Sequence, residues 1–444
     1  MTAADDGPDD VRAGRQKRWV TLVGLLLVPA LLLRFSGTGL AQPLEAAIFG
    51  MGIVAAAFLL SWAAEVAQLD ISAGLALSLV ALIAVLPEYA VDAVFTIHGG
   101  RSFRAHGGAC PAPGGGTSPC ELALANMTGG NRLLIGVGWT MVAYLAFWVF
   151  KRRGTPKQQL ELDRTKSVEL SYLAVACAYS LTLPFKSSIT LFDTVVLVAI
   201  FVAYTVRLSK APPEEPHLVG PARWIGTFPT GRRRAAVVGL FVVACAVILL
   251  CAEQFAAALV GTGQEFGVSE FLLVQWLAPL ASESPELIVA GLYAYRLNIT
   301  NGLGALVSSK VNQWTLLVGT LPVVFAVSSH SLHGLPIISL QREELLITAA
   351  QSVFAVAVLA SLSLSRRECH LLLGLFLFQF VFSGIGPERF HGVVLVGVSV
   401  VYLALAVVVV AGDRRRLPRL LRDGFVTKYS ELARGAEGAD DRLR

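Results

Sequence analysis

The chain has 444 residues, of which 55% are hydrophobic and 15% are charged. These proportions exclude an ordinary soluble domain and indicate a membrane protein with several spans, each helical because lipid offers no partner to unpaired backbone groups. The formal net charge of +5 does not favour nucleic-acid binding, since Lys and Arg lie in short segments between apolar stretches rather than on one soluble face.

Apolar stretches long enough to cross about 30 Å of hydrocarbon recur along the chain, and they predict twelve spans. The first lacks a small-residue cleavage site, so we expect it to be retained rather than removed as a signal peptide. The predicted spans are about 19–37, 44–67, 71–97, 121–150, 167–184, 188–208, 235–259, 268–295, 300–328, 343–364, 369–386 and 391–412.

The positive charges between the spans predict the orientation. The basic segments 12–18, 151–157, 232–234, 366–367 and 414–422 fall on one side when twelve spans are counted, which makes that side cytoplasmic. We therefore expect a plasma-membrane protein with both termini in the cytoplasm. The predicted parts are an N-terminal tail 1–18, a first membrane half 19–208, a cytoplasmic linker 209–234, a second membrane half 235–412 and a C-terminal tail 413–444.

The connector 98–120 is expected outside and carries two of the six cysteines. Cys110 and Cys120 flank the segment PAPGGGTSP, and either a disulfide or two free thiols fits a compartment that permits oxidation. No Cys or His has the spacing of a metal site, and no nucleotide-binding or hydrolase motif occurs in the sequence. We expect no cofactor, and an enzyme is the least favoured class.

The two membrane halves carry the same three elements in the same order. In the first half, WAAEVAQ (62–68) precedes ALIAVLPEYAVDAVF (81–95) and ELALANMTGGNRLLIGVGW (121–139). In the second half, LLCAEQFAA (249–257) precedes WLAPLASESPELIVAGLY (276–293) and NGLGALVSSKVNQWTLLVG (301–319). The span count gives corresponding helices opposite directions, and such inverted repeats are typical of alternating-access transporters with a site at the midplane.

Each repeat sets a proline beside a glutamate within a span. Pro87 and Pro285 are expected to break their helices and to free carbonyl oxygens next to Glu88 and Glu286. Carbonyl and carboxylate oxygens together suit hard cations such as Ca²⁺ or Na⁺. An unpaired carboxylate in hydrocarbon costs about 2.5 to 3.5 kcal/mol, so it usually faces a partner or an aqueous path. A buried ion pair without a transport role is the alternative for these glutamates.

Three further charged residues are possible charge partners at this site: Asp92, Arg132 and Lys310. Lys310 could replace one coupling cation with its ammonium group, or it and Arg132 could serve as counter-ions for Asp92 and Glu283. Glu283 has no counterpart in the first copy, where Val85 stands, and we expect Lys310 to be its partner.

The segments IAVLPE (83–88), ASESPE (281–286), ANMTGGNRLL (125–134) and GALVSSKVNQ (304–313) resemble the two α-repeats of the cation/calcium antiporter superfamily, which includes the sodium/calcium exchangers. The resemblance implies an all-α polytopic protein with an inverted core of five plus five helices and an extra helix at each end. It places the α-repeats at about 71–150 and 268–328. It implies Glu88 and Glu286 as the central carboxylate ligands, with Ser282 and Ser309 at hydroxyl positions of the pattern. The predicted cation-binding set also includes Glu283, Asn131 and Gln313.

Several positions depart from the pattern of this superfamily. Ala84 and Val85 replace hydroxyl residues, Leu134 replaces a ligand Asn, Gln313 replaces a ligand Asp and Lys310 replaces an Asn. Several oxygens that would bind sodium are therefore missing.

The predicted function is a secondary cation antiporter that moves Ca²⁺ or a related cation against Na⁺ or H⁺ by alternating access. A Na⁺(K⁺)/H⁺ exchanger on the same fold and a transport-inactive scaffold or sensor are the alternatives, and a channel is less favoured because inverted repeats indicate alternating access. The expected partners are inorganic cations and the lipid bilayer, with no nucleic acid. The sequence makes no prediction of the oligomeric state.

Overall fold

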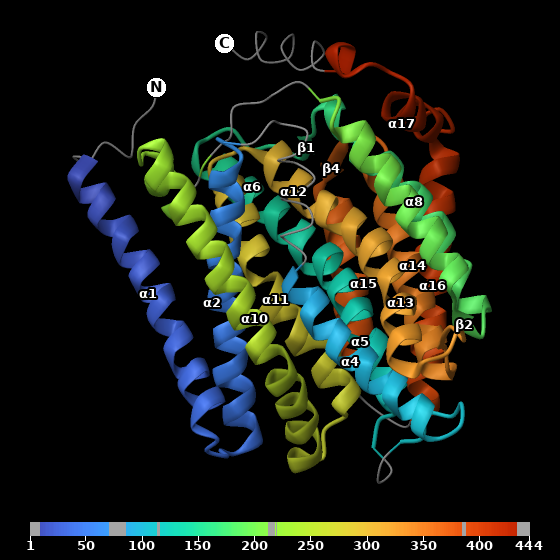
Figure 1. The fold of residues 1–444 in the computed structure, drawn as a ribbon. Helices are drawn as coiled ribbons and strands as arrows, with labels where there is room; N and C mark the ends of the chain where they lie inside the picture. Colours follow the sequence, from blue (N-terminus) through green and yellow to red (C-terminus); the bar gives the residue numbers. More distant parts are fainter. Residues whose placement is uncertain are drawn as a thin grey trace.

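The structure is a computed structural model that describes residues 9–70, 86–112, 116–211, 218, 220–383 and 388–432. Long helices packed side by side form most of it (Figure 1). The helices of the first half are α1 (Asp9–Ser36), α2 (Gln42–Ala67), α4 (Leu86–Ala105), α5 (Pro119–Leu133), α6 (Thr140–Arg152), α7 (Ser167–Ser180) and α8 (Leu191–Leu208). Those of the second half are α9 (Pro221–Gly226), α10 (Thr230–Phe266), α11 (Glu270–Tyr295), α12 (Ile299–Asn312), α13 (Val318–Ser329), α14 (Ser339–Leu359), α15 (Arg366–Ser383), α16 (Glu388–Gly412) and α17 (Arg416–Phe425).

Every predicted span overlaps a helix or a stacked pair of helices, although residues 71–85 of the third span lie outside the described residues. Within the described part of the chain, eight helical stretches are long and apolar enough to cross a membrane. The remaining predicted spans correspond to four further helices: α4, α11, α14 and α15. Each of these has more charged side chains than the eight stretches, or a shorter described length. The number of twelve spans stays a prediction.

Both repeats contain a short π-helical segment at a corresponding place. It covers Leu134–Trp139 between α5 and α6, and Gln313–Leu317 between α12 and α13. The segments begin at Leu134 and Gln313, the two positions at which the sequence departs from the ligand Asn and Asp of the superfamily pattern. Because π-helical turns occur frequently at functional sites, this shared irregularity marks the same place in each repeat as a candidate for function.

The buried apolar side chains form two large clusters and a third, small one of Val168, Tyr429 and Leu432. One large cluster is built mainly from α1, α2 and α10 and the sides of α4, α5 and α11 that face them. The other large cluster is built from α5 to α8 and α12 to α16. Figure 1 shows α1, α2 and α10 together along one side of the molecule. Close packing holds this group together, since a Cβ on Gly52 of α2 would lie 2.6 Å from the Ala30 Cβ of α1.

The two ends of the helical bundle differ. The start of α1, helix α17 and a two-stranded pairing of β1 (Gln159–Glu161) with β4 (Ser363–Ser365) lie at one end, here named the terminal end (Figure 1). The opposite end, here named the loop end, holds the connector after α4 and the pairing of β2 (Ser188–Ile189) with β3 (Leu335–Pro336). Cys110 of that connector forms a disulfide with Cys120 at the start of α5.

Candidate functional site

Two carboxylates from opposite repeats meet at one amide group in the middle of the bundle. Nε2 of Gln313 donates to Oε1 of Glu88 over 2.8 Å and also donates to Oε1 of Glu283. Both glutamates are buried, with 4% and 2% of their surface exposed. Their second oxygens, Oε2 in each case, have no hydrogen-bond partner among the described residues. The structure therefore brings together two acids that each keep one oxygen free for a cation or a proton.

A small residue on α5 permits this arrangement. A Cβ on Gly130 would lie 3.1 Å from Oε1 of Glu88 and 3.5 Å from the Cβ of Pro279. A larger side chain there would push against the carboxylate, so the glycine lets α5 approach the site closely. The sequence pattern of small residues on this helix is explained by that close approach.

Glu286 lies in a cavity that reaches the terminal end. The cavity has a volume of about 260 Å³. It extends from Gln68 and Tyr293, at the terminal ends of α2 and α11, to Glu286 in the last third or so of α11. Ser282 and Ser309, two of the predicted ligands, line its wall. Water and ions from the terminal end therefore have space to approach Glu286.

The expected break of α11 at Pro285 is wrong. Helix α11 is continuous from Glu270 to Tyr295, with both Pro279 and Pro285 inside it. A proline removes one backbone donor, and the hydrogen bonds of the other residues in the helix are enough to keep the turn. Pro87 is the second residue of described helix α4, and the residues before Leu86 lie outside the described part of the chain.

Asn131 and Ser282 turn their polar groups toward their own helices. Nδ2 of Asn131 donates to the carbonyl of Met127 over 2.9 Å, and Oγ of Ser282 donates to the carbonyl of Ala278 over 3.2 Å. Such bonds to the preceding turn satisfy the donors and leave the oxygen of each side chain able to accept or to coordinate.

Lys310 has a different partner from the one expected. Its Nζ donates to the backbone carbonyl of Asn131 and lies 5.7 Å from the ring centre of Trp314. The side chain is fully buried. Among the described residues no ion pair joins Lys310 to Glu283, whose hydrogen-bond donor is Gln313. The predicted partnership of Lys310 with Glu283 is therefore not a direct ion pair in the described part of the chain, although the two groups are close enough to interact electrostatically.

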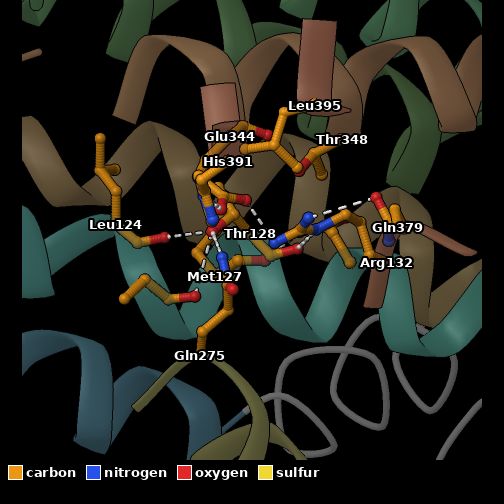
Figure 2. Close-up of polar contacts among 12 residues, drawn as sticks. Leu124, Met127, Thr128, Arg132, Gln275, Glu344, Thr348, Gln379, His391 and Leu395 are labelled. Atoms are coloured by element: carbon orange, nitrogen blue, oxygen red, sulfur yellow. Dashed lines mark hydrogen bonds and ion pairs between the residues drawn. The ribbon is translucent and has the colours of Figure 1, made fainter. Parts of the chain in front are cut away.

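Arg132 belongs to a separate buried network (Figure 2). It forms an ion pair with Glu344 of α14, approaches Oε1 of Gln379 at 3.4 Å and lies 4.9 Å from the ring centre of Trp276. Nε2 of His391 lies 3.3 Å from the other oxygen of Glu344. Arg132 is thus not a counter-ion of Asp92 or Glu283, because Glu344 already neutralises it.

Glu344, Gln379 and His391 are absent from the residues that the sequence predicts. One signal for them exists, since an acid inside the apolar stretch EELLITAA (343–350) requires a buried partner. Nothing in the sequence indicates which positively charged side chain is the partner of Glu344.

Asp92 lies one helical turn from Glu88 on α4 and has an amide partner. Nδ2 of Asn126 donates to its Oδ1 over 2.9 Å. Asp92 is fully buried, and no ion pair with it occurs in the described ranges. The expected pairing with Arg132 or Lys310 is therefore absent from this part of the chain.

The chain resembles known proteins over most of its length. A family model described as sodium/calcium exchanger protein matches residues 44–210 and 236–385. The crystal structure of an H⁺/Ca²⁺ exchanger, CAX, is 36% identical, with a TM-score of 0.83 over 96% of this chain and 99% of that chain. Selenium-substituted YfkE, a Ca²⁺/H⁺ antiporter, is 14% identical, with a TM-score of 0.54 over 88% of this chain and 100% of that chain, and this likeness shows the fold alone.

No curated protein sequence matches the chain. The family match and the CAX structure confirm the predicted resemblance and the predicted fold class, a polytopic all-α membrane protein with two repeats.

Proposed function

The chain belongs to the sodium/calcium exchanger protein family and is a cation antiporter, and from this premise we propose that it exchanges Ca²⁺ for H⁺. The family consists of transporters, which agrees with the expectation that the chain is not an enzyme. The choice of ions rests on the similarity to CAX, an H⁺/Ca²⁺ exchanger, and on the chemistry of the site.

One observation carries the proposal: carboxylates from opposite repeats converge on Gln313 with their second oxygens free. A divalent cation is neutralised by two carboxylates, and the same oxygens accept protons when the cation leaves. Glu88, Glu283 and Glu286 are the proposed exchanging groups, with hydroxyl oxygens from Ser282 and Ser309 beside Glu286. Competition between Ca²⁺ and H⁺ for the same oxygens couples their movement in opposite directions.

The missing sodium ligands favour H⁺ as the coupling ion. Ala84, Val85 and Leu134 offer no side-chain oxygen at positions where the superfamily pattern has one. Sodium needs a set of several oxygen ligands, whereas a proton needs only one basic oxygen. The loss of neutral ligands together with retention of the glutamates is therefore expected for proton coupling.

The cavity at Glu286 corresponds to the state open toward the terminal end. Alternating access then requires α1, α2 and α10, which share one apolar cluster, to move against the remaining helices. In the proposed orientation both termini lie in the cytoplasm and the membrane is the plasma membrane, so the cavity is cytoplasmic.

A Na⁺(K⁺)/H⁺ exchanger is the second candidate, because the buried ammonium of Lys310 lowers the charge that a transported cation must supply. The two candidates differ in the cation whose movement a pH gradient drives.

Lipid vesicles containing the purified and reconstituted chain test these functions. We expect an imposed pH gradient to drive Ca²⁺ uptake, and Glu286→Gln to reduce it at least about tenfold through the loss of a charged ligand. Ser284→Ala is the matched control, because Ser284 lies in the same motif and bonds to the carbonyl of Leu280 in its own helix. Proton-driven Na⁺ or K⁺ flux without Ca²⁺ flux would establish the second candidate. Unchanged Ca²⁺ flux in Glu286→Gln would remove Glu286 from the site.

A further inference from the structure

A second group of oxygens lies on the loop-end side of the central carboxylates. Asp92 follows Glu88 by four residues on α4, which places it about one helical turn, or about 6 Å, nearer the loop end. Asp92 is 0% exposed, and Oδ2 has no hydrogen-bond partner among the described residues. A fully buried carboxylate with one neutral amide as its donor is expensive unless a cation or a proton visits it.

Asn126 and Thr96 add neutral oxygens near Asp92. Nδ2 of Asn126 donates to Asp92, while Oδ1 of Asn126 has no partner in the described part of the chain. Thr96 lies one further turn along α4, is 0% exposed and has an Oγ1 that is likewise without a partner there. Carboxylate, amide and hydroxyl oxygens are the ligand types that Ca²⁺ uses. Each unsatisfied buried oxygen of this kind needs an explanation, and a visiting cation would explain all three together.

A cavity at the loop end leads toward this group. It has a volume of about 500 Å³ and is lined by His98 and Glu270 among other residues. Its wall includes Phe95 of α4, three residues after Asp92, and Leu122 of α5, four residues before Asn126. Asp92 and Asn126 therefore lie between the loop-end cavity and the central pair of Glu88 and Glu283.

The second repeat has no equivalent of Asp92. The residue four positions after Glu286 is Ala290, which is fully buried. On that side the cavity at Glu286 already gives direct access from the terminal end. The two repeats therefore differ: the acid one turn beyond the central glutamate lies on the loop-end side only, whereas Glu65 of α2 lines the open cavity on the other side.

We propose that Asp92 and Asn126 form an outer subsite that holds the transported divalent cation between the central carboxylates and the loop end. The proposal rests on the proposed exchange of Ca²⁺. A cation that leaves Glu88 toward the loop end would pass from one carboxylate to the next over one helical turn, without crossing a purely apolar segment.

Sided transport in membrane vesicles tests the subsite. The probe is ⁴⁵Ca²⁺, offered either to the loop end or to the terminal end in vesicles of the two orientations, with the opposing pH held constant. Asp92→Asn keeps the hydrogen bond from Asn126 and removes the charge. We expect the KM for Ca²⁺ at the loop end to rise about tenfold. At the terminal end we expect KM to change less than about twofold, since Glu286 is reached there without the subsite.

A charge exchange between the two residues is the matched variant. The double substitution Asp92→Asn with Asn126→Asp keeps the pair and moves the carboxylate to α5, and we expect the loop-end KM to return to within about threefold of wild type. The double variant also tests the subsite if the protein with Asp92→Asn alone fails to assemble. Equal effects at both ends, no effect at either end, or a double variant as impaired as Asp92→Asn would each overturn the subsite. Absence of proton-driven Ca²⁺ flux in the unmodified chain would instead overturn the proposed function.

Discussion

Glu88 and Glu283 come from opposite repeats and accept hydrogen bonds from the same atom, Nε2 of Gln313. The neutral amide holds the two acids near each other without supplying a positive charge. A cation bound to their free oxygens would therefore be neutralised by both repeats at once, which is the arrangement expected at the midplane of an inverted-repeat transporter. Glu283 has no counterpart in the first repeat, and it lies instead beside Glu88, the acid of that repeat.

This relationship predicts that Glu283 is as important as Glu286. In Glu283→Gln, one charge is lost and a second amide is placed against the amide of Gln313. We expect Ca²⁺ flux to fall at least about tenfold with a raised KM, measured by ⁴⁵Ca²⁺ uptake at several concentrations. Glu45→Gln is the control, because Glu45 accepts a bond from the backbone of Leu40 at the loop-end start of α2. A Glu283→Gln variant with the kinetics of the control would exclude Glu283 from the site.

The buried ammonium of Lys310 predicts an effect on the charge moved per cycle. It bonds to the carbonyl of Asn131 and, in its protonated form, places a positive charge in the middle of the bundle. In Lys310→Met, one more transported cation is needed to balance the same carboxylates. We expect the charge carried per cycle to change by about one elementary charge, which the reversal potential of flux in vesicles measures.

The control for Lys310 is Lys157→Met, since Lys157 lies over the ring of Phe150 near the terminal end of α6. A Lys310→Met protein that is less stable but keeps the wild-type reversal potential would show that the ammonium only supports the fold.

The ion pair of Arg132 and Glu344 predicts that removing one partner destabilises the protein far more than removing both. Each side chain is 1% exposed, so removal of one partner leaves an unpaired buried charge. We expect Arg132→Met or Glu344→Leu alone to destabilise the protein by about 3 to 5 kcal/mol, and the double variant to recover most of that loss. Thermal unfolding of detergent-solubilised protein measures the stability of the three variants against wild type. Additive losses in the double variant would mean that the ion pair is not the source of the effect.

The chemistry of the site can be predicted from local sequence. The Pro-Glu pairs of 87–88 and 285–286 and the small residues that follow them indicate the repeats, because a carboxylate within an apolar span usually faces a partner or an aqueous path. Gln313 is also among the predicted ligands. These signals depend on residues within one helix, where spacing fixes which side chains share a face.

The partners of the charged residues cannot be predicted in this way. Arg132 and Glu344 are separated by more than two hundred residues and meet through the packing of α5 against α14, which no local pattern encodes. Charge alone pairs Lys310 with Glu283, but the packing of α12 directs Lys310 to the carbonyl of Asn131 and directs Gln313 to the acid. The effect of Pro285 is smaller than its sequence position suggests, since a long helix tolerates the loss of one donor.

The ion cluster that joins α2 to α10 at the terminal end predicts a pH dependence of stability. Asp70 accepts two hydrogen bonds of 2.8 Å from Arg233 and one of 3.1 Å from Arg234. The bonded guanidinium of Arg233, assisted by Arg234, lowers the pKa of Asp70 from 3.8 to about 2, although partial burial opposes this shift. A lowered pKa means that the folded protein binds a proton less readily at this site than the unfolded chain does, so the cluster stabilises the fold wherever Asp70 is ionised in both states.

The stabilisation by Asp70 is therefore complete above about pH 4 and is lost as the pH falls through the folded pKa of about 2. We expect Asp70→Asn to have a lower Tm than wild type, with a difference that is constant from about pH 7 to 5 and shrinks between about pH 4 and 2. Asp163→Asn, which alters an exposed acid at the terminal end, is the control variant measured alongside it. A Tm difference for Asp70→Asn that persisted unchanged to pH 2 would mean that the carboxylate acts through neutral packing, because protonation of Asp70 removes the charge that Arg233 and Arg234 hold.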